Sequence, residues 1–400
     1  MFRFHSLILS RRLRYHHHLH FLRKFSSATS HPLELPLSHP IYIIWGSNTG
    51  VGKTLVSTGI AASALLSSPS YFHYLKPLQT GFPSDSDSRF LLTKLRHLFL
   101  RRTGPRPSLS ASHVLLNASS AATGSRGNEA KFPEEDNVAG GGEGVGSSRL
   151  FCKTLYAWEE AVSPHLAAER ENGAVEDSLV LETLQRCFRE VVESGVGKER
   201  SEVMCVVETA GGVASPGASG SLQCDLYRPF RIPAILVGDG RLGGISGTIS
   251  AYESLTLRGY DVVAVVFEDQ GLLNEGPVMS YMRNKIPVLV LPPVPKDPSN
   301  DLMEWFEGSH NLFSNLREIM VSAYLERVKK FHDMPRKARD IIWWPFTQHK
   351  LVPEGAVTVI DSRCGENFAV FKSQSTEVVA PLFDACASWW TQGPNAILQV

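Results

Sequence analysis

The stretch IYIIWGSNTGVGKTLVSTGI, residues 41–60, constrains the fold more than any other part of the chain. An apolar, β-branched run leads into a glycine-rich turn, and Gly-Lys-Thr then opens an apolar helix. A strand, such a loop and a helix N-terminus together direct backbone N–H groups and the positive end of the helix dipole at phosphates. Lys53 would then reach the β- and γ-phosphates of a nucleotide, and Thr54 would coordinate Mg²⁺. The stretch therefore predicts a phosphate-binding loop.

The glycine spacing of this loop departs from the general pattern. That pattern places about four residues between its first glycine and the Gly-Lys pair. Here five residues separate Gly46 from Gly52. The departure leaves open which class of nucleotide-binding protein the loop serves.

The chain from residue 41 to about residue 330 alternates strand-like and helix-like segments. The strand candidates are continuous apolar runs, which is typical of parallel strands that are buried on both faces. They lie at residues 41–46, 72–77, 202–209, 233–240, 261–269 and 286–293. Helical patterns lie between them, at residues 52–66, 178–193, 244–258 and 273–284. The alternation predicts an α/β fold with a doubly wound, mostly parallel sheet, like that of P-loop NTPases.

Several polar side chains follow the predicted strands, at the edge where open α/β sheets bind ligands. Lys76 ends the second strand and could clamp an anionic substrate, although a lysine there is more often a solvated charge. Glu208 directly follows the third strand, where a carboxylate could bind a metal ion or orient water. Asp85 or Asp87 could hold Mg²⁺, although Asp and Ser clusters more often cap helices. His165, at a predicted helix start, fits a binding role and a packing role equally well.

The N-terminal segment has a different composition from the rest. Residues 1–30 hold six basic residues and no acidic residue. An Arg-rich, Ser-containing segment without acids is typical of organelle transit peptides. Because arginine dominates over serine, we interpret residues 1–30 as a mitochondrial transit peptide and expect the protein in the matrix; a chloroplast leader is the alternative. No apolar run approaches the roughly 20 residues of a membrane span, and we expect neither a membrane nor a nucleic-acid partner.

Two further features are compositional. Residues 106–148 are rich in Ser, Gly and Ala and include GGGEGVGSS at residues 140–148. Such a segment buries too little apolar surface to order itself, which predicts a disordered insertion. The six cysteines show no C-x-x-C motif and no metal-ligand spacing, which indicates reduced thiols rather than a disulfide framework.

Several motifs taken together resemble one enzyme family. The segments GSNTGVGKT (46–54), LKPLQTG (75–81), SDSDS (84–88), VSPHLAA (162–168) and ETAGGVASP (208–216) occur in the order found in dethiobiotin synthetases. The resemblance covers residues 40–328, and the five-residue glycine spacing is that family's own form. It implies a homodimer that uses ATP and Mg²⁺ to convert 7,8-diaminononanoate and CO₂ to dethiobiotin.

The resemblance also implies roles for individual residues. The diamine and CO₂ would form a carbamate, which attacks the γ-phosphate of ATP before the second amine closes the ureido ring. Catalytic roles would belong to Lys53, Lys76 and Thr80, and the magnesium ligands would be Thr54, Asp87 and Glu208. The nucleotide would contact Gly46, Asn48, Thr49, Gly50, Val51, Gly52, Lys53, Thr54 and Leu55. The substrate would contact Lys76, Thr80, Gly211 and Gly212.

The C-terminal segment resembles a second family. WWPFTQH (343–349) and DACASWWTQGP (384–394) are similar to the beginning of diaminopelargonic acid aminotransferases, which use pyridoxal phosphate (PLP). We interpret residues 340–400 as the truncated start of such a class-III aminotransferase domain. The lysine that would bind PLP would lie beyond residue 400, so the cofactor and the transaminase activity are expected only in a longer form.

Two alternatives to a ligase remain at this point. A switch ATPase of the ParA/MinD type has the same kind of loop, but such proteins usually carry a lysine early in it, and residues 46–48 contain none. An inactive scaffold is the other alternative, and it is disfavoured because every expected ligand residue is present.

Overall fold

The computed structural model describes residues 33–101, 108–118, 130–131, 146–297, 300–343, 353–364, 367–373 and 376–383. The predicted transit peptide and the motif at residues 384–394 lie outside these ranges. Within them, no helix combines the length and the apolar character that crossing a membrane requires.

The main element of the fold is a nine-stranded sheet with the strand order β10-β9-β8-β2-β7-β3-β6-β4-β5. Every neighbouring pair is parallel except β4 and β5. The strands are β2 (Ile41–Gly46), β3 (Tyr71–Gln79), β4 (Ser108–Ala118), β5 (Ala130–Lys131), β6 (Ser147–Ala157), β7 (Val203–Gly212), β8 (Ala234–Val237), β9 (Val262–Glu268) and β10 (Val288–Leu291). The predicted α/β fold with a mostly parallel sheet is confirmed.

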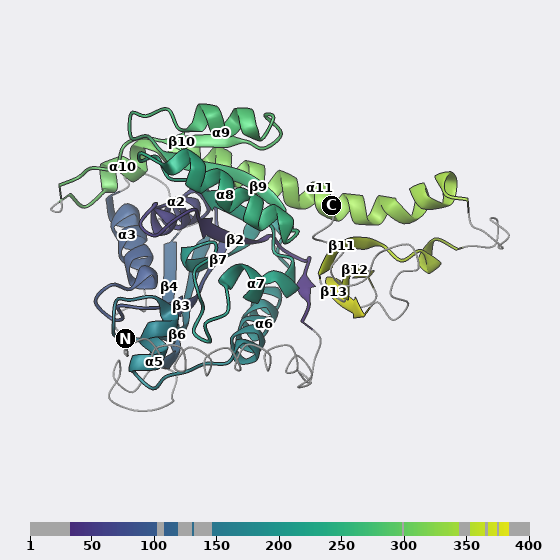
Figure 1. Cartoon of the computed structure of the whole chain (residues 1–400), viewed down its shortest axis with the longest axis horizontal. Coiled ribbons are helices and arrows are strands. Elements are labelled where there is room, and N and C mark those ends of the chain that lie inside the picture. The colour runs from purple at the N-terminus through teal and green to yellow at the C-terminus, as the bar shows by residue number, and fades with distance from the viewer. Residues whose placement is uncertain are drawn as a thin grey trace, which may run out of the picture. The chain divides into compact units, whose positions relative to one another are not determined.

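Helices cover both faces of this sheet, as Figure 1 shows. The usual right-handed crossovers put α2 and α3 on one face, where α10 and α11 join them through contacts with α3 and α2. The crossovers after β6, β8 and β9 run in the opposite direction along the sheet, which puts α6, α8 and α9 on the other face. The α-helices are α2 (Lys53–Leu65), α3 (Asp87–Arg101), α5 (Pro164–Arg170), α6 (Asp177–Ser194), α7 (Gln223–Leu226), α8 (Gly244–Leu257), α9 (Glu275–Tyr281), α10 (Met303–Gly308) and α11 (His310–Ile341). Short 3₁₀ turns are η3 (Arg200–Glu202), η4 (Arg228–Phe230) and η6 (Glu354–Ala356).

Burial on both faces of the sheet explains the continuously apolar sequence of its central strands. All six residues of β2 are buried at the centre of the sheet. A strand covered on both faces has no polar side to present, so its sequence is continuously apolar. The carboxyl ends of β2, β3 and β7, which are neighbours in the sheet, therefore meet at one edge and bring their polar terminal residues together.

The prediction of disorder over residues 106–148 is wrong for residues 108–118, which form β4 and pair in parallel with β6. It is also wrong for residues 130–131, which form β5, and for residues 147–148, which begin β6. The physical reason is a period of two: Leu109, Ala111, His113 and Leu115 are buried, whereas the residues between them are more exposed. Serine at the alternate positions hides this pattern when only composition is considered. Residues 119–129 and 132–145 lie outside the described ranges.

A second sheet joins the two ends of the described chain. It is antiparallel, with the order β1-β13-β12-β11, and consists of β1 (Leu35–Pro36), β11 (Ile360–Cys364), β12 (Asn367–Ser373) and β13 (Glu377–Phe383). The expected boundaries at residues 328 and 340 both fall inside α11, which continues to Ile341. Residues 35–36 thus pair with strands of the segment that we expected to be a separate domain.

Candidate active site

The loop between β2 and α2 has the backbone geometry of a phosphate cradle. Gly50 and Gly52 have φ angles of 69° and 94°, in the left-handed region where glycine is favoured. A side chain at Gly46 would place its Cβ 2.7 Å from the carbonyl oxygen of Asn48, so the tight turn needs a glycine there. Asn48, Thr49 and Gly50 are exposed at the tip of the loop, and Val51 is buried beneath it. The N–H groups at the start of α2 are thereby left facing a ligand position.

Lys53 connects this loop to the end of β7. Its Nζ atom donates a hydrogen bond to the carbonyl oxygen of Gly211 at 2.7 Å. Burial, and then the charge of Lys76, lower the pKa of Lys53 to about 8. An ammonium group with so little solvent gains strongly from a nearby anion, which suits it to a phosphate oxygen.

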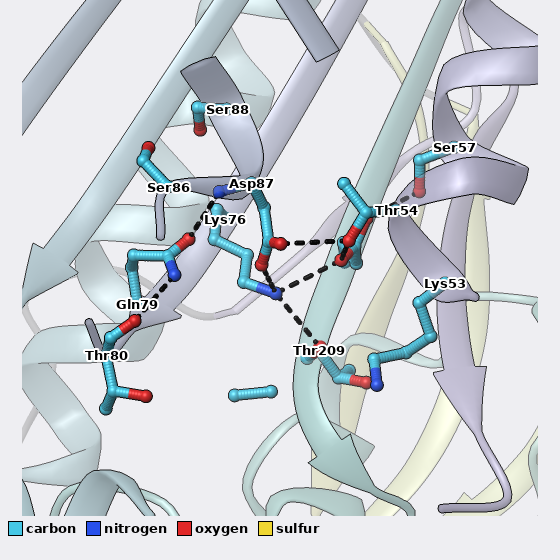
Figure 2. Close-up of polar contacts among 12 residues, drawn as sticks. Lys53, Thr54, Ser57, Lys76, Gln79, Thr80, Ser86, Asp87, Ser88 and Thr209 are labelled. Carbon is cyan, nitrogen blue, oxygen red and sulfur yellow. Dashed lines mark hydrogen bonds and ion pairs between the residues drawn. The ribbon is translucent and has the colours of Figure 1, made fainter. Parts of the chain in front are cut away.

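Three residues predicted as magnesium ligands converge beneath the loop, and Figure 2 labels two of them, Thr54 and Asp87. The Thr54 hydroxyl oxygen lies 2.9 Å from an oxygen of Asp87 and 2.9 Å from Oε1 of Glu208. Thr54 lies in the first turn of α2, Asp87 opens α3 and Glu208 lies in β7, so three separate elements meet at this point. Asp85, the other candidate, lies in the loop before α3 and is not part of this cluster.

Lys76 lies between the two carboxylates. Its Nζ atom is 2.5 Å from Asp87 Oδ2 and 3.1 Å from Glu208 Oε1, and it also donates to the carbonyl oxygen of Thr209 at 3.2 Å. An ammonium group has three N–H bonds, and these three acceptors match them. Burial alone would lower the pKa of Lys76, but Asp87 and then Glu208 outweigh it and raise that pKa above its ordinary value. Burial likewise acts to raise the pKa of Asp87, and Lys76 holds it below the ordinary value.

Four buried residues that the sequence reasoning missed support this cluster. Ser57 and Tyr74 donate hydrogen bonds to Glu208 Oε2 at 2.7 Å and 3.0 Å. The Gln79 amide group binds the carbonyl oxygens of Thr80 and Asp85 and accepts the N–H of Asp87, which fixes the loop before α3.

Gln223 does the same for the segment after Glu208. Its amide group accepts the N–H of Ala210 at 3.1 Å and donates to the carbonyl oxygen of Ala210 at 2.7 Å. Its side chain is fully buried. The two glutamines therefore hold both loops that border the candidate site.

The predicted substrate residues border the same region. Figure 2 shows Thr80 and Lys53 on opposite sides of Lys76. Gly211 has a φ angle of 70°, and a Cβ at Gly212 would lie 3.3 Å from the carbonyl oxygen of Ser47. Leu55, in the first turn of α2, packs partly buried against the core. His165 lies apart from this cluster, on α5, where its Nδ1 is 3.1 Å from the hydroxyl oxygen of Ser163.

The chemistry of the cluster fits Mg²⁺. Thr54, Asp87 and Glu208 offer hard oxygen donors from a hydroxyl and two carboxylates, and Mg²⁺ in nucleotide sites takes one or two carboxylates with phosphates and water. The described residues contain no group of three or more His, Cys, Asp and Glu side chains that could hold a metal ion by themselves. The set therefore suits an ion that arrives with a nucleotide better than a fully protein-bound metal.

Comparisons with known proteins find relatives that are named dethiobiotin synthetase. The chain is 58% identical to the mitochondrial bifunctional dethiobiotin synthetase/7,8-diamino-pelargonic acid aminotransferase of Arabidopsis thaliana, over 98% of this chain and 48% of that protein. Its rice counterpart is 54% identical over 92% of this chain and 44% of that protein. The ATP-dependent dethiobiotin synthetase of Haloferax mediterranei is 24% identical, and the match covers 64% of this chain and 85% of that protein.

The resemblance to dethiobiotin synthetases is confirmed. The chain spans about half the length of the bifunctional relatives that it matches. A family model described as an AAA domain matches residues 147–302. Among solved structures, a MinC:MinD complex from Aquifex aeolicus has a TM-score of 0.37 at 12% identity, with 72% of this chain and 96% of that chain covered. A ParA family ATPase from Chlorobium tepidum has a TM-score of 0.35 at 8% identity, with 72% and 98% covered.

Proposed function

We propose that this chain is a dethiobiotin synthetase, an ATP-dependent cyclo-ligase that converts 7,8-diaminononanoate and CO₂ to dethiobiotin. The observation that carries the proposal is the convergence of Lys53, Lys76, Thr54, Asp87 and Glu208 at the carboxyl ends of β2, β3 and β7, next to the phosphate loop. The relatives named dethiobiotin synthetase support the substrate assignment.

In this mechanism the chain acts by positioning and by electrostatic stabilisation. A carbamate oxygen of the substrate attacks the γ-phosphorus, ADP leaves, and the second amine then attacks the carbamoyl carbon and releases phosphate. Lys53 donates to the phosphate oxygens in place of the Gly211 carbonyl. Lys76 exchanges one of its three acceptors for the carbamate or the transferring phosphoryl group.

The neighbours of Lys76 have matching roles. Thr80, Gly211 and Gly212 border the position of the substrate, and their small size lets it approach the backbone. Thr54, Asp87 and Glu208 would hold Mg²⁺, which supplies charge neutralisation of the phosphates. The loops held by Gln79 and Gln223 keep these groups in place.

The setting of the enzyme is part of the proposal. The plant relatives are named as mitochondrial, and with the Arg-rich leader this supports a location in the mitochondrial matrix. A homodimer is proposed from the family resemblance. We assign no PLP chemistry to the described residues; the three strands at residues 360–383 are proposed to be the beginning of an aminotransferase part.

The proposal is tested by ADP release with defined omissions. ADP release is expected to require both 7,8-diaminononanoate and bicarbonate, and Lys76→Ala is expected to abolish it while nucleotide binding is largely retained. Rapid ATP hydrolysis without the diamine would instead indicate a switch ATPase of the ParA/MinD type. Loss of nucleotide binding in Lys76→Ala would contradict the role given to Lys76.

A further inference from the structure

The two carboxylate oxygens of Glu208 have different surroundings, and only one of them faces Thr54 and Lys76. Oε1 faces Thr54 at 2.9 Å and Lys76 at 3.1 Å, which is the side of the candidate metal position. Oε2 faces away from it and accepts hydrogen bonds from the Ser57 hydroxyl at 2.7 Å and the Tyr74 hydroxyl at 3.0 Å. The side chains of Glu208, Ser57 and Tyr74 are fully buried.

We propose that Ser57 and Tyr74 are positioning residues, which saturate Glu208 Oε2 so that Oε1 alone is presented to the divalent cation. This inference rests on the magnesium–nucleotide part of the proposed function. It assigns both hydroxyl groups to the binding of the metal–nucleotide complex rather than to the core alone.

The register of the two elements supports the assignment. In a strand, residues two apart point to the same face, so Tyr74 and Lys76 of β3 both point at Glu208. In a helix, residues three apart share a face, so Ser57 lies one turn behind Thr54 on α2. Each element therefore supplies one group to Oε1 and one group to Oε2 of the same carboxylate.

The coordination geometry of Mg²⁺ explains why the orientation of the Glu208 carboxylate matters. Mg²⁺ demands near-ideal octahedral geometry with short oxygen contacts. A carboxylate free to rotate could present two oxygens or turn away, whereas Glu208 is held by donors on both oxygens. When groups that hydrogen-bond to a metal ligand and fix its orientation are removed, the metal affinity falls by about 10- to 100-fold.

The experiment measures how nucleotide binding depends on Mg²⁺. Tyr74→Phe and Ser57→Ala each remove one hydroxyl group and leave the remaining side chain in the core. Binding of a fluorescent ADP analogue is titrated with Mg²⁺, and the half-saturating Mg²⁺ concentration is expected to rise about tenfold in either variant. Binding of the analogue in EDTA is expected to be unchanged.

Two matched controls separate positioning from general core stability. Tyr42→Phe removes a buried hydroxyl that donates to the carbonyl oxygen of Met320, and Ser63→Ala removes one on the same helix α2 that donates to Ile60. Both controls are expected to retain the parent Mg²⁺ dependence, whatever their effect on the melting temperature.

The inference is overturned if Tyr74→Phe and Ser57→Ala keep the parent Mg²⁺ dependence, or if the controls shift it as much. Because the titration contains no diamine, it does not depend on dethiobiotin formation. A protein that shows the expected shift but makes no dethiobiotin would contradict the proposed reaction and leave the role of Ser57 and Tyr74 standing.

Discussion

At the scale of single residues, the candidate site is a nearly closed set of charges. Asp87 and Glu208 contribute two carboxylates, and Lys76 and Lys53 contribute two ammonium groups; Glu208 and both lysines are buried, and Asp87 is partly exposed. Buried charges are stable only when they are paired and hydrogen-bonded. Lys76 therefore acts as the counter-ion of the two carboxylates when no metal is bound, and it competes with Mg²⁺ for the same oxygens.

This competition predicts that removing the Lys76 charge abolishes turnover but strengthens the binding of Mg²⁺. Lys76→Met keeps the apolar stem and removes the charge, so the carboxylates lose their internal counter-ion. We expect turnover to be abolished. We also expect the half-saturating Mg²⁺ concentration for nucleotide binding to fall about tenfold, because two carboxylates without a counter-ion attract a cation more strongly. Titration of ADP binding with Mg²⁺ measures this, with Lys94→Met, far along α3, as the unaffected control. Weaker or unchanged Mg²⁺ dependence would contradict the counter-ion role.

The sequence predicts some of these residues and hides others. Lys53, Thr54, Lys76, Asp87 and Glu208 could be found because each is a polar residue in a recognisable motif at the end of a strand or the start of a helix. The supporting donors look like core residues instead: a tyrosine inside an apolar strand and a serine in an apolar helix carry no motif. For Tyr74, the one available signal is its two-residue spacing from Lys76, which places both side chains on the same face of a strand.

At the scale of elements, the packing of α11 on α2 depends on one glycine. A Cβ at Gly59 would lie 2.3 Å from two ring atoms of Phe313, far closer than a van der Waals contact. Gly59→Ala is therefore expected to lower the free energy of unfolding by about 2 kcal/mol through overpacking, despite the better helix propensity of alanine.

The matched control lies in α8. A Cβ at Gly247 would meet no atom within 4 Å, so Gly247→Ala should be neutral or stabilise by up to about 1 kcal/mol. Urea unfolding of both variants measures the difference. Equal stability of Gly59→Ala and the parent protein would show that α11 does not pack on α2 in this way.

The strands differ in how clearly their sequences reveal them. The continuous apolar runs of β2, β3, β7, β8, β9 and β10 were predictable because burial on both faces leaves a simple signal. The strands β4 and β6 give a weaker signal because only one of their faces is fully buried, and the serines at alternate positions of β4 hide its period of two. The pairing of β1 with β13 joins residues more than 300 positions apart, and no local pattern encodes such a contact.

At the scale of the described molecule, the small sheet is attached at the amino ends of the main strands. Arg327 donates to Asp361 of β11 at 3.1 Å, and Arg200 donates to Glu377 of β13 at 2.7 Å. Phe331 of α11 stacks on Phe371 of β12, with ring centroids 5.2 Å apart. The phosphate loop lies at the carboxyl ends of the strands, so these contacts are separated from the candidate site.

This separation predicts a variant that loosens the small sheet without affecting catalysis. Asp361→Ala removes a charged hydrogen-bond acceptor, which is expected to cost about 2 kcal/mol of local stability. Hydrogen exchange in residues 360–383 should become faster, and ADP release should be unchanged. Glu354→Ala breaks an exposed pair with Arg339 and should change neither quantity. A loss of ADP release in Asp361→Ala would show that the small sheet supports the site after all.

In the proposed reaction, ATP bound at the phosphate loop transfers its γ-phosphoryl group to a carbamate of the diamine. The most direct measurement supplies the purified chain with ATP, Mg²⁺, 7,8-diaminononanoate and ¹³C-bicarbonate and analyses the products by mass spectrometry. We predict dethiobiotin that carries one ¹³C atom, formed in equal amount to ADP and only when the diamine and bicarbonate are both present. ADP formation without the labelled product would contradict this reaction.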